Sequence, residues 1–521
     1  MTAAKLSAFE NDWLKQWALY APESIAFQDA ETGVRYSYAK LYDLSQQLAL
    51  HLSTQFGVEA GDRVAVFAGN ELEYIPLFFA THRLGAILVP INFRLTGREV
   101  AHIIEDSEPR LIIREEKYSS VIAIACERFL PQGIWSFDGR AGLRPFLLNA
   151  AAVPAASAMA VVSRSQDPCM ILYTSGTTGA PKGAMITFDM IHWNSISTGL
   201  RLNLNQSDVA VTFSPFFHTS GWNVLVTPFL HRGARTVLIR KFDAEKILEL
   251  CEQEQVTVLF GVPTTMEMMA RSPNFARVDL SSIRFAVVGG EPMPIDLIHA
   301  WENKGIPIRQ GYGLTEFGPN VFSLNEQDSI RKIGSIGFAN FYIETRIVDD
   351  EDRDLAVGEI GELVLRGPVC TPGYWRNPEA TSHAIKNGWF HTGDLVRKDA
   401  EGYHYVAGRK KDMFISGGEN VYPVEVERFL STHPAIREVA VIGVPDAKWG
   451  EVGKAFIALK TGCEISSREI LAFCEGNLAK YKIPKSVAIL TELPKGDSGK
   501  ILKRKLAEAT EQRPPLAEVM T

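Results

Sequence analysis

The chain has few cysteines, no excess of basic residues and no long apolar run. Its six cysteines are scattered over 521 residues, and no CxxC pair or Cys/His spacing suggests a zinc site. A disulfide framework is not expected in so long a chain, and a reducing compartment fits this scatter. The net charge of −7 argues against a nucleic-acid binder that relies on a basic face.

No apolar stretch reaches the roughly 18–20 residues that a membrane-spanning helix needs. The longest candidate runs from Tyr74 to Pro90 and is interrupted by His82 and Arg83. The segment 1–12 carries acidic residues where a signal peptide would be apolar. We therefore expect a cytoplasmic protein without a transmembrane segment. Peripheral contact with a membrane and assembly into a homodimer stay open.

Length and periodicity predict an α/β fold with more than one domain. A chain of 521 residues is too long for a single hydrophobic core. Between about residues 35 and 310, short apolar runs alternate with amphipathic stretches, which predicts parallel sheets with helices on both faces. We expect strands at 63–68, 86–90, 111–113, 209–213, 236–239 and 256–260. We expect helices at 71–85, 96–107, 222–231 and 243–255.

The pattern changes in the last third of the chain. Residues 333–408 contain short strands and glycine turns, which predicts a smaller β-rich subdomain. A compact α+β module follows, with helices expected at 422–431 and 467–479 and strands at 439–442 and 455–459. We predict an N-terminal domain of residues 1–408 and a small C-terminal domain of residues 409–521.

The most informative motif is the sequence Tyr-Thr-Ser-Gly-Thr-Thr-Gly-Ala-Pro-Lys-Gly at residues 173–183, which follows an apolar run at 170–172. Its hydroxyl groups, backbone N–H groups and Lys182 suit a polyphosphate ligand. The motif departs from a P-loop because Pro181 lacks an N–H group and Gly183 cannot ligate magnesium. We therefore expect the loop to contact phosphates and the metal to be held elsewhere. A flexible surface turn is the alternative.

Three later segments place glycine and acidic residues at the ends of short strands: 287–291, 310–316 and 389–394. Glycine at a strand end lets the backbone approach a flat ligand closely. A carboxylate supplies the hard oxygen that magnesium prefers, or accepts hydrogen bonds from the two hydroxyls of a ribose. Each segment alone is also an ordinary turn, so its meaning depends on the others.

Taken in order, these motifs resemble the signatures of the adenylate-forming superfamily, which includes acyl-CoA synthetases, luciferases and peptide-synthetase adenylation domains. The resemblance covers nearly the whole chain and favours the branch that makes acyl-CoA from fatty or aryl acids. It implies that ATP, Mg²⁺, CoA and a small carboxylic acid are bound. It also implies a mobile C-terminal domain that rotates between two steps: formation of an acyl-adenylate, then transfer of the acyl group to CoA.

The resemblance implies roles for particular residues. Glu316 is the implied magnesium ligand, Thr315 a phosphate contact and Tyr312 the ring that stacks on adenine. Lys500 is the implied catalytic lysine, which bridges the carboxylate and the α-phosphate. The Gly-Asp-Ser-Gly sequence at 496–499 is also typical of serine-protease nucleophiles, but the lysine and the basic helix expected at 501–505 argue against that interpretation.

The resemblance implies a larger set of residues around the nucleotide and CoA. Asp394 is expected to bind the ribose hydroxyls, Arg409 the ribose or a phosphate, and Gly417 with Gly418 the pantetheine arm of CoA. Lys411 matches the hinge between the domains. The full set of expected nucleotide and CoA contacts is Thr174, Ser175, Gly176, Thr177, Thr178, Lys182, Gly290, Glu291, Gly311, Tyr312, Gly313, Asp394, Arg409, Gly417 and Gly418.

The acid is expected to contact His218, Trp222 and Gly289. His218 is assigned to substrate positioning rather than to proton transfer. Trp222 matches a tryptophan that gates the acyl tunnel of some long-chain ligases, and it fits a core residue equally well. Trp222 and the apolar run 224–226 favour a medium- or long-chain fatty acid, with an aryl acid as the alternative.

Single features of the sequence argue for or against other activities of the same superfamily. An enzyme that loads an amino acid onto a carrier-protein thiol would carry an aspartate in its pocket, and the segment 216–222 has none. A nucleotide-binding protein without turnover is disfavoured because Glu316, Asp394, Arg409 and Lys500 are all present. A luciferase-like oxygenase stays open, since its chemistry begins with the same adenylation.

Overall fold

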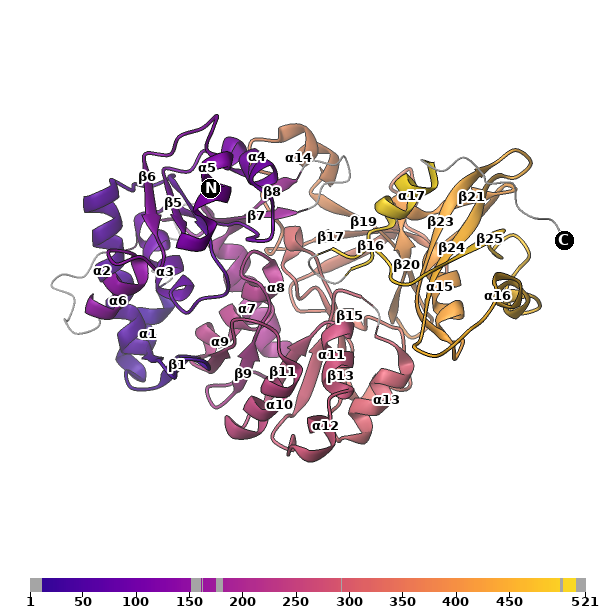
Figure 1. The fold of residues 1–521 in the computed structure, drawn as a ribbon, viewed down its shortest axis with the longest axis horizontal. Helices are drawn as coiled ribbons and strands as arrows, with labels where there is room; N and C mark the ends of the chain where they lie inside the picture. Colours follow the sequence, from indigo (N-terminus) through magenta and orange to yellow (C-terminus); the bar gives the residue numbers. More distant parts are fainter. Residues whose placement is uncertain are drawn as a thin grey trace, which may run out of the picture. The chain divides into compact units, whose positions relative to one another are not determined.

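The structure is a computed structural model that describes residues 12–150, 161, 163–174, 181–291, 293–496 and 500–511. The chain folds into two compact units (Figure 1). The first unit comprises Met1–Thr345 and Leu365–Phe390, and the second comprises Arg346–Val364 and His391–Thr521.

This division differs from the predicted domain boundary at residue 408. Residues 346–364 and 391–408 lie in the second unit. The division between the units therefore passes through three strands, each of which contributes residues to both. These strands are β16 (Glu344–Val348), β17 (Gly361–Arg366) and β19 (Trp389–Lys398). A boundary at 408 between two functional domains stays a prediction.

The first unit contains a six-stranded sheet with the order β6-β5-β3-β4-β7-β8. Its strands are parallel except for the last pair, β7 with β8. The strands are β3 (Arg63–Phe67), β4 (Ile87–Pro90), β5 (Leu111–Arg114), β6 (Gly133–Ser136), β7 (Pro168–Thr174) and β8 (Lys182–Thr187). The helices connecting or flanking them are α2 (Tyr38–Phe56), α3 (Tyr74–Leu84), α4 (Gly97–Ser107), α5 (Ser119–Ala125) and α6 (Leu143–Ala150).

Both faces of this sheet are buried, as the parallel arrangement requires. Val64 and Val66 of β3 belong to the hydrophobic cluster that includes α2, α3 and α6. Ala65 and Phe67 belong to a second cluster, which includes α4 and α5. Successive residues of the strand therefore face helices on opposite sides, which confirms the predicted α/β layering.

Two further sheets complete the core of the first unit, with the orders β2-β1-β10-β9 and β11-β12-β13-β14-β15. The strands of the first are β1 (Ile25–Asp29), β2 (Arg35–Ser37), β9 (Val209–Thr212) and β10 (Arg235–Leu238). Those of the second are β11 (Val258–Gly261), β12 (Phe285–Val288), β13 (Ile308–Tyr312), β14 (Phe322–Ser323) and β15 (Phe338–Ala339). The helices of this unit are α1 (Trp13–Tyr20), α7 (Phe188–Arg201), α8 (Thr219–Asn223), α9 (Val226–Arg232), α10 (Ala244–Gln253), α11 (Pro263–Ala270), α12 (Asn274–Arg277), α13 (Ile295–Asn303) and α14 (Pro378–Ala384). The strand β18 (Ile385–Lys386) belongs to another sheet, in which it pairs with β19.

The helix predicted at 222–231 is instead two short helices, α8 and α9. Pro228 has no N–H group to donate to the carbonyl of Val224, so an unbroken helix would lose this bond. The side-chain amide of Asn320 donates to the Val224 carbonyl instead, at 3.1 Å. The helix predicted at 71–85 also differs, because α3 begins only at Tyr74 and residues 69–73 form a loop.

The apolar stretch from Tyr74 to Pro90 forms part of the core. Within the described residues, no helix is long and apolar enough to cross a membrane. Every residue of α3 and of β4 is buried, including Arg83. The Arg83 guanidinium forms a buried ion pair with Asp12, at 2.6 Å. Because its charge is paired, Arg83 can lie inside the protein although it interrupts the apolar run.

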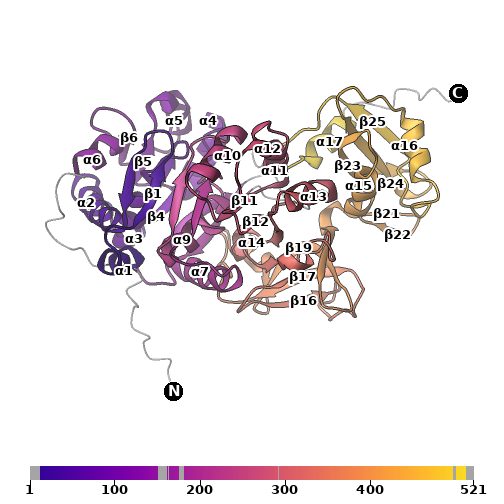
Figure 2. The same cartoon turned by 90° about the horizontal axis from the view of Figure 1, so that it is seen from below.

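The second unit contains a sheet with the order β22-β21-β24-β23 and β25 added to β24 (Figure 2). Its strands are β21 (Phe414–Ser416), β22 (Glu419–Val421), β23 (Ile436–Asp446), β24 (Gly450–Leu459) and β25 (Ser486–Leu490), and β20 (His404–Arg409) pairs with β19. The helices are α15 (Pro423–Ser431), α16 (Ser467–Cys474) and α17 (Lys503–Glu511). The α+β character of this module is as predicted, although α16 ends five residues earlier than expected, at Cys474 instead of Ala479.

Two histidines, the buried His82 and the partly buried His231, are expected to make the first unit sensitive to acid. His82 stacks on Phe188, with ring centroids 4.1 Å apart, and His231 stacks on Trp13, at 4.3 Å. Burial lowers the pKa of each histidine to about 3. In the unfolded chain these side chains titrate near a pKa of about 6.5. Their contribution to stability is therefore complete above that value and is lost as the pH falls toward 3.

We expect His82→Phe to lessen this acid sensitivity. Below a pH of about 6.5, the wild-type free energy of unfolding should fall by about 1.4 kcal/mol per pH unit for each such histidine. The variant keeps a ring against Phe188 and removes one titrating group, so its unfolding free energy should decline less steeply. Denaturant unfolding measured at several pH values between about 7 and 5 gives the slope. Equal slopes for the two proteins would contradict the prediction.

Candidate functional site

In the first unit, two parallel strands bring separate motifs to one sheet edge. β12 pairs with β13, so Gly289–Glu291 and Gly311–Tyr312 follow or end neighbouring strands. The side chain of Gln310 ties them together, since its Nε2 donates to the carbonyls of Val288 and Glu291, both at 3.2 Å. A Cβ atom on Gly289 would lie 3.6 Å from the Gly311 carbonyl. The structure thus places Gly289, Gly290 and Glu291 beside Gly311 and Tyr312.

The chain folds back sharply after β13. A Cβ atom on Gly313 would lie only 2.0 Å from the Pro319 carbonyl oxygen, so only glycine fits there. The Tyr312 ring packs edge-on against Phe322, with centroids 5.8 Å apart, and it is half-buried. This arrangement holds Tyr312 at the sheet edge with part of its surface accessible, and Thr315 follows in the one-turn helix η2 (Thr315–Phe317).

Glu316, the expected magnesium ligand, is held by a segment that is distant in sequence. Its Oε1 accepts a hydrogen bond from the Tyr374 hydroxyl at 2.9 Å, and its backbone carbonyl accepts from the Thr371 N–H at 2.8 Å. Among the described residues, no group of three or more His, Cys, Asp or Glu side chains could hold a metal ion. A single carboxylate still fits Mg²⁺, which is commonly bound by one or two carboxylates together with substrate phosphates and water.

Tyr374 also contacts Lys182, the lysine of the expected phosphate loop. The Nζ of Lys182, the first residue of β8, lies 5.5 Å from the centroid of the Tyr374 ring. One tyrosine therefore contacts both Lys182 and Glu316. The sequence reasoning missed Tyr374, and its only local signal is the Pro-Gly pair before it. Thr174 lies opposite Lys182 in the β7–β8 pair, whereas Ser175, Gly176, Thr177 and Thr178 lie outside the described residues.

His218 is the N-cap residue of α8 and is half-buried. Its ring lies 4.6 Å from that of Phe217, between centroids. The loop before it is compact, because the His218 N–H donates to the Pro215 carbonyl at 3.0 Å. A Cβ atom on Gly221 would lie 2.3 Å from the same carbonyl oxygen. The position of His218 is thus fixed by a tight turn rather than by a flexible loop.

Trp222 packs in the hydrophobic core of the first unit. The side chain is fully buried, and its Nε1 donates to the Phe216 carbonyl at 2.6 Å. The rings of Phe216 and Phe78 lie 4.7 Å and 5.3 Å from it. With no exposed surface and its polar atom bonded to the backbone, the indole packs as core. This burial favours the core alternative, and the role of Trp222 as a tunnel gate stays a prediction.

In the second unit, Asp394 and Arg409 lie directly opposite each other in the β19–β20 pair. Arg409 Nε contacts Asp394 Oδ1 at 2.7 Å. Asp394 is buried, and its N–H bonds to the Thr392 hydroxyl, whereas the Arg409 side chain is 48% exposed. The two residues expected at the ribose thus form one ion pair whose arginine reaches solvent.

The lysines after β20 differ in their surroundings. Lys410 contacts Asp350 at 2.8 Å and Glu362 at 3.1 Å. Burial lowers the pKa of Lys410, but hydrogen bonds to these two carboxylates outweigh it and raise the pKa above its usual value. Lys411 is exposed in the one-turn helix η4 (Lys410–Asp412), which links β20 to β21. The hinge role of Lys411 stays a prediction.

Gly417 and Gly418 form the two-residue turn between β21 and β22. Both have positive φ angles, +62° and +89°, and Ser416 pairs with Glu419 on either side. Such tight hairpins strongly favour glycine, so the pair has a local structural reason. Trp449 covers Gly417, where a Cβ atom would lie 2.8 Å from the indole, and Trp449 is 43% exposed. Sequence reasoning did not single out this tryptophan.

Lys500 lies in the second unit, next to a bridge between two short backbone segments. Lys495 and Ile501 form a β-bridge, and the Gly496 N–H donates to the Lys500 carbonyl at 2.8 Å. The residue is exposed. The basic helix expected at 501–505 begins at Lys503, as α17. Its start is anchored by an ion pair from Lys503 to Glu427, at 2.7 Å.

Comparison with known proteins places the chain in a family. The model of the AMP-binding enzyme family matches residues 14–375, and that of the AMP-binding enzyme C-terminal domain matches residues 425–500. A feruloyl-CoA synthase of Amycolatopsis sp is 38% identical over 492 residues, covering 94% of this chain and 97% of that protein. The long-chain-fatty-acid–CoA ligase FadD13 of Mycobacterium tuberculosis is 37% identical over 496 residues, covering 95% and 97%.

A solved structure gives the same result for the fold. The crystal structure of ATP-bound MatB from Rhodopseudomonas palustris has a TM-score of 0.87 and 33% identity, and the match covers 96% of this chain and 99% of that one. Enzymes of this class use ATP and CoA as substrates, with Mg²⁺ as the usual partner ion. The chain therefore belongs to the AMP-binding enzyme family of the adenylate-forming superfamily, among its acyl-CoA synthetases.

Proposed function

We propose that this enzyme converts a carboxylic acid with an apolar body into its CoA thioester through an acyl-adenylate. The observation that carries the proposal is Tyr374, which contacts both Lys182 and Glu316. It brings the expected phosphate-binding cation and the expected magnesium carboxylate to one place. A site with these two charges suits ATP, whose adenylyl group would pass to the acid while pyrophosphate leaves.

In the first step the acid's carboxylate attacks the α-phosphorus of ATP, and pyrophosphate leaves. Lys182 offsets charge on the phosphates, and Glu316 would hold Mg²⁺, which neutralises phosphate charge when bound. Asp394 accepts hydrogen bonds from the ribose, and Arg409 contacts the ribose or a phosphate. Lys500 stabilises the charge that develops between the carboxylate and the α-phosphate.

In the second step the CoA thiol attacks the acyl carbon, the bond to phosphate breaks, and AMP leaves. The turn at Gly417 and Gly418 is proposed to border the pantetheine arm. Trp449, which lies over Gly417 and is partly exposed, offers an apolar surface at the same place. None of these three residues is proposed to contact ATP.

The burial of Trp222 weakens the sequence argument for an acyl tunnel and for a fatty acid. Val224, Leu225 and Val226 are buried too, so the run is core. A small enclosed cavity borders the His218 loop, and its lining includes Phe213, Ser214, Ser220, Leu225 and Phe260. This cavity has room for about one water molecule and its lining mixes hydroxyl and apolar groups, so it does not select a class of acid. We therefore propose a fatty acid or an aryl acid, and the aryl class gains support from relatives named for ferulate and indoleacetate.

A two-stage assay tests this function. Fatty acids and aryl acids are supplied with ATP and Mg²⁺, and acid-dependent exchange between ATP and pyrophosphate is measured. CoA is then added, and AMP and thioester are quantified. The proposal expects both signals from at least one acid. Exchange without thioester, together with acylation of a carrier-protein thiol, would favour the carrier-loading alternative.

Location and assembly stay predictions. All six cysteines are free, which fits the proposed cytoplasmic location. A homodimer and peripheral contact with a membrane stay predictions as well.

We expect Gly418→Leu to separate the two steps. A Cβ atom at this position meets nothing within 4 Å, so a side chain fits in the absence of CoA. We expect the leucine side chain to block the path of the pantetheine arm. Pyrophosphate exchange should stay near the wild-type rate, while thioester formation should fall by about 100-fold or more. Both rates and the melting temperature are measured on the same preparation.

Gly418→Asn is the matched control for backbone strain. Asparagine tolerates a positive φ better than leucine and has a shorter side chain, so it should lose less thioester formation. Loss of both half-reactions together with a lower melting temperature would show that the glycine serves only the turn. Thioester formation at the wild-type rate by folded Gly418→Leu would refute the proposed passage.

A further inference from the structure

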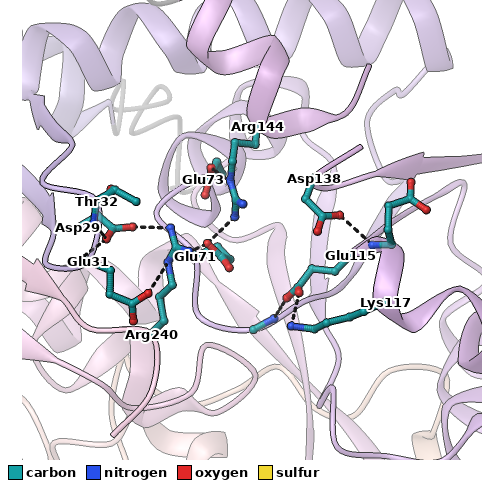
Figure 3. A network of polar contacts seen from close by, with 12 residues as sticks. Asp29, Glu31, Thr32, Glu71, Glu73, Glu115, Lys117, Asp138, Arg144 and Arg240 are labelled. Atoms are coloured by element: carbon teal, nitrogen blue, oxygen red, sulfur yellow. Dashed lines mark hydrogen bonds and ion pairs between the residues drawn. The ribbon is translucent and has the colours of Figure 1, made fainter. Parts of the chain in front are cut away.

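The loop 69–73, which joins β3 to α3, is held in place by buried charges (Figure 3). The Gly69 N–H donates to Glu115 Oε1 at 2.6 Å. Arg144 binds two carboxylates of the loop, Glu71 at 2.6 Å and Glu73 at 2.7 Å. Three of the five loop residues are thus tied to other parts of the first unit.

A second arginine completes this frame. Arg240 contacts Glu71 at 3.2 Å and Asp29 at 2.7 Å. Asp29 is itself fixed, because it accepts hydrogen bonds from the N–H groups of Glu31 and Thr32. Arg144 and Arg240 together offset buried carboxylates that would otherwise repel one another. The loop is therefore rigid enough to position whatever it carries.

The loop carries Asn70, whose side chain bonds to a distant backbone segment. Asn70 Nδ2 donates to the carbonyls of Phe213, at 3.3 Å, and Ser214, at 2.9 Å. Asn70 Oδ1 accepts from the Phe216 N–H at 3.0 Å. The residue is only 4% exposed. An amide supplies donor and acceptor from one planar group, which neither aspartate nor alanine can do.

The segment that Asn70 binds leads directly to His218. It leaves β9 at Thr212 and reaches α8 through the compact turn in which Gly221 packs against the Pro215 carbonyl. On its other side, the Phe216 carbonyl accepts from the Trp222 indole. Asn70 and Trp222 thus bond the N–H and the carbonyl of the same residue, Phe216, and His218 follows two residues later.

We propose that Asn70 is a positioning residue for acid activation: it holds the backbone at 213–216 so that His218 faces the carboxylic acid. The inference rests on the proposed function, in which His218 borders the acid. Asn70 does not touch the acid or ATP, and it acts through the loop. Its loss should therefore weaken the productive placement of the acid while the nucleotide site stays intact.

A double-mutant cycle with His218→Ala tests the inference, with ferulate and dodecanoate as probe acids. In the pyrophosphate-exchange assay, Asn70→Ala and Asn70→Asp should lower kcat/KM for the acid by about 10- to 100-fold, with the KM for ATP changed less than about threefold. When His218→Ala is already present, Asn70→Ala should add a loss of less than about threefold. Equal losses in both backgrounds would overturn the inference.

Gln28→Ala is the matched control for loss of a buried amide. Gln28 is 6% exposed and bonds Glu254 and Arg235 at another place in the first unit. It should lower the melting temperature and leave the KM for the acid unchanged. If Gln28→Ala raises the KM for the acid as much as Asn70→Ala does, the effect of Asn70→Ala reflects a general loss of stability. That result would refute the positioning role.

A crystal structure of Asn70→Ala gives a result that is independent of turnover. The inference expects residues 213–218 to shift from their wild-type positions, and an unmoved loop would refute it. Failure of the enzyme to activate any acid or form any thioester would instead count against the proposed function. The two failures are therefore distinguishable.

Discussion

The Lys500→Ala variant is expected to lose acyl-adenylate formation by about 100- to 1,000-fold while it still converts supplied acyl-AMP and CoA to thioester. The lysine is proposed to offset charge that develops only while the carboxylate attacks the α-phosphate. Removing a group that acts in one transition state lowers the rate of that step alone. Acid-dependent pyrophosphate exchange measures the first step, and thioester formation from synthetic acyl-AMP measures the second.

Lys460→Ala is a suitable control for Lys500→Ala. Lys460 is also an exposed lysine of the second unit, next to the end of β24, and it has no proposed role. Both half-reactions should stay near the wild-type rate in this variant. If Lys500→Ala slows both half-reactions equally, the lysine has a different function.

The layers of the fold follow from patterns that are local in sequence. Strands such as β3, β5 and β11 are short apolar runs bounded by polar or glycine residues, and their positions match the expectation within about two residues. The start of α3 does not, because Glu71 and Glu73 have good helix propensity but bind Arg144 instead. A tertiary ion pair outweighed the local preference, and no pattern near residue 71 could reveal its partner.

The candidate site shows the same division between local and long-range information. The motifs locate Glu316, Asp394 and Arg409, and the structure brings the last two into contact. Tyr374 could not be found this way, because its contact with Glu316 joins residues 58 positions apart. The two interpretations of Trp222 could not be separated from the sequence for a related reason. A residue four positions from His218 can lie on the buried side of a short helix, and sequence spacing does not show which side faces the ligand.

The Glu316→Gln variant is expected to lose pyrophosphate exchange by about 100-fold or more and to need higher Mg²⁺ for its remaining activity. Glutamine has nearly the same shape, and its carbonyl can still accept the Tyr374 hydroxyl. It lacks the negative charge that a hard divalent cation requires. Exchange rates measured over a series of Mg²⁺ concentrations separate weaker metal binding from a fold defect, with the melting temperature as a check.

Tyr374→Phe separates the charge of Glu316 from its orientation. This variant keeps the carboxylate and the ring beside Lys182, and it removes only the hydroxyl that bonds Oε1. We expect a loss of about tenfold, smaller than that of Glu316→Gln, because the metal ligand remains but is less well oriented. Thioester formation from supplied acyl-AMP should be unchanged in both variants, since that step consumes no ATP. An unaltered Mg²⁺ dependence in Glu316→Gln would mean that another residue holds the metal.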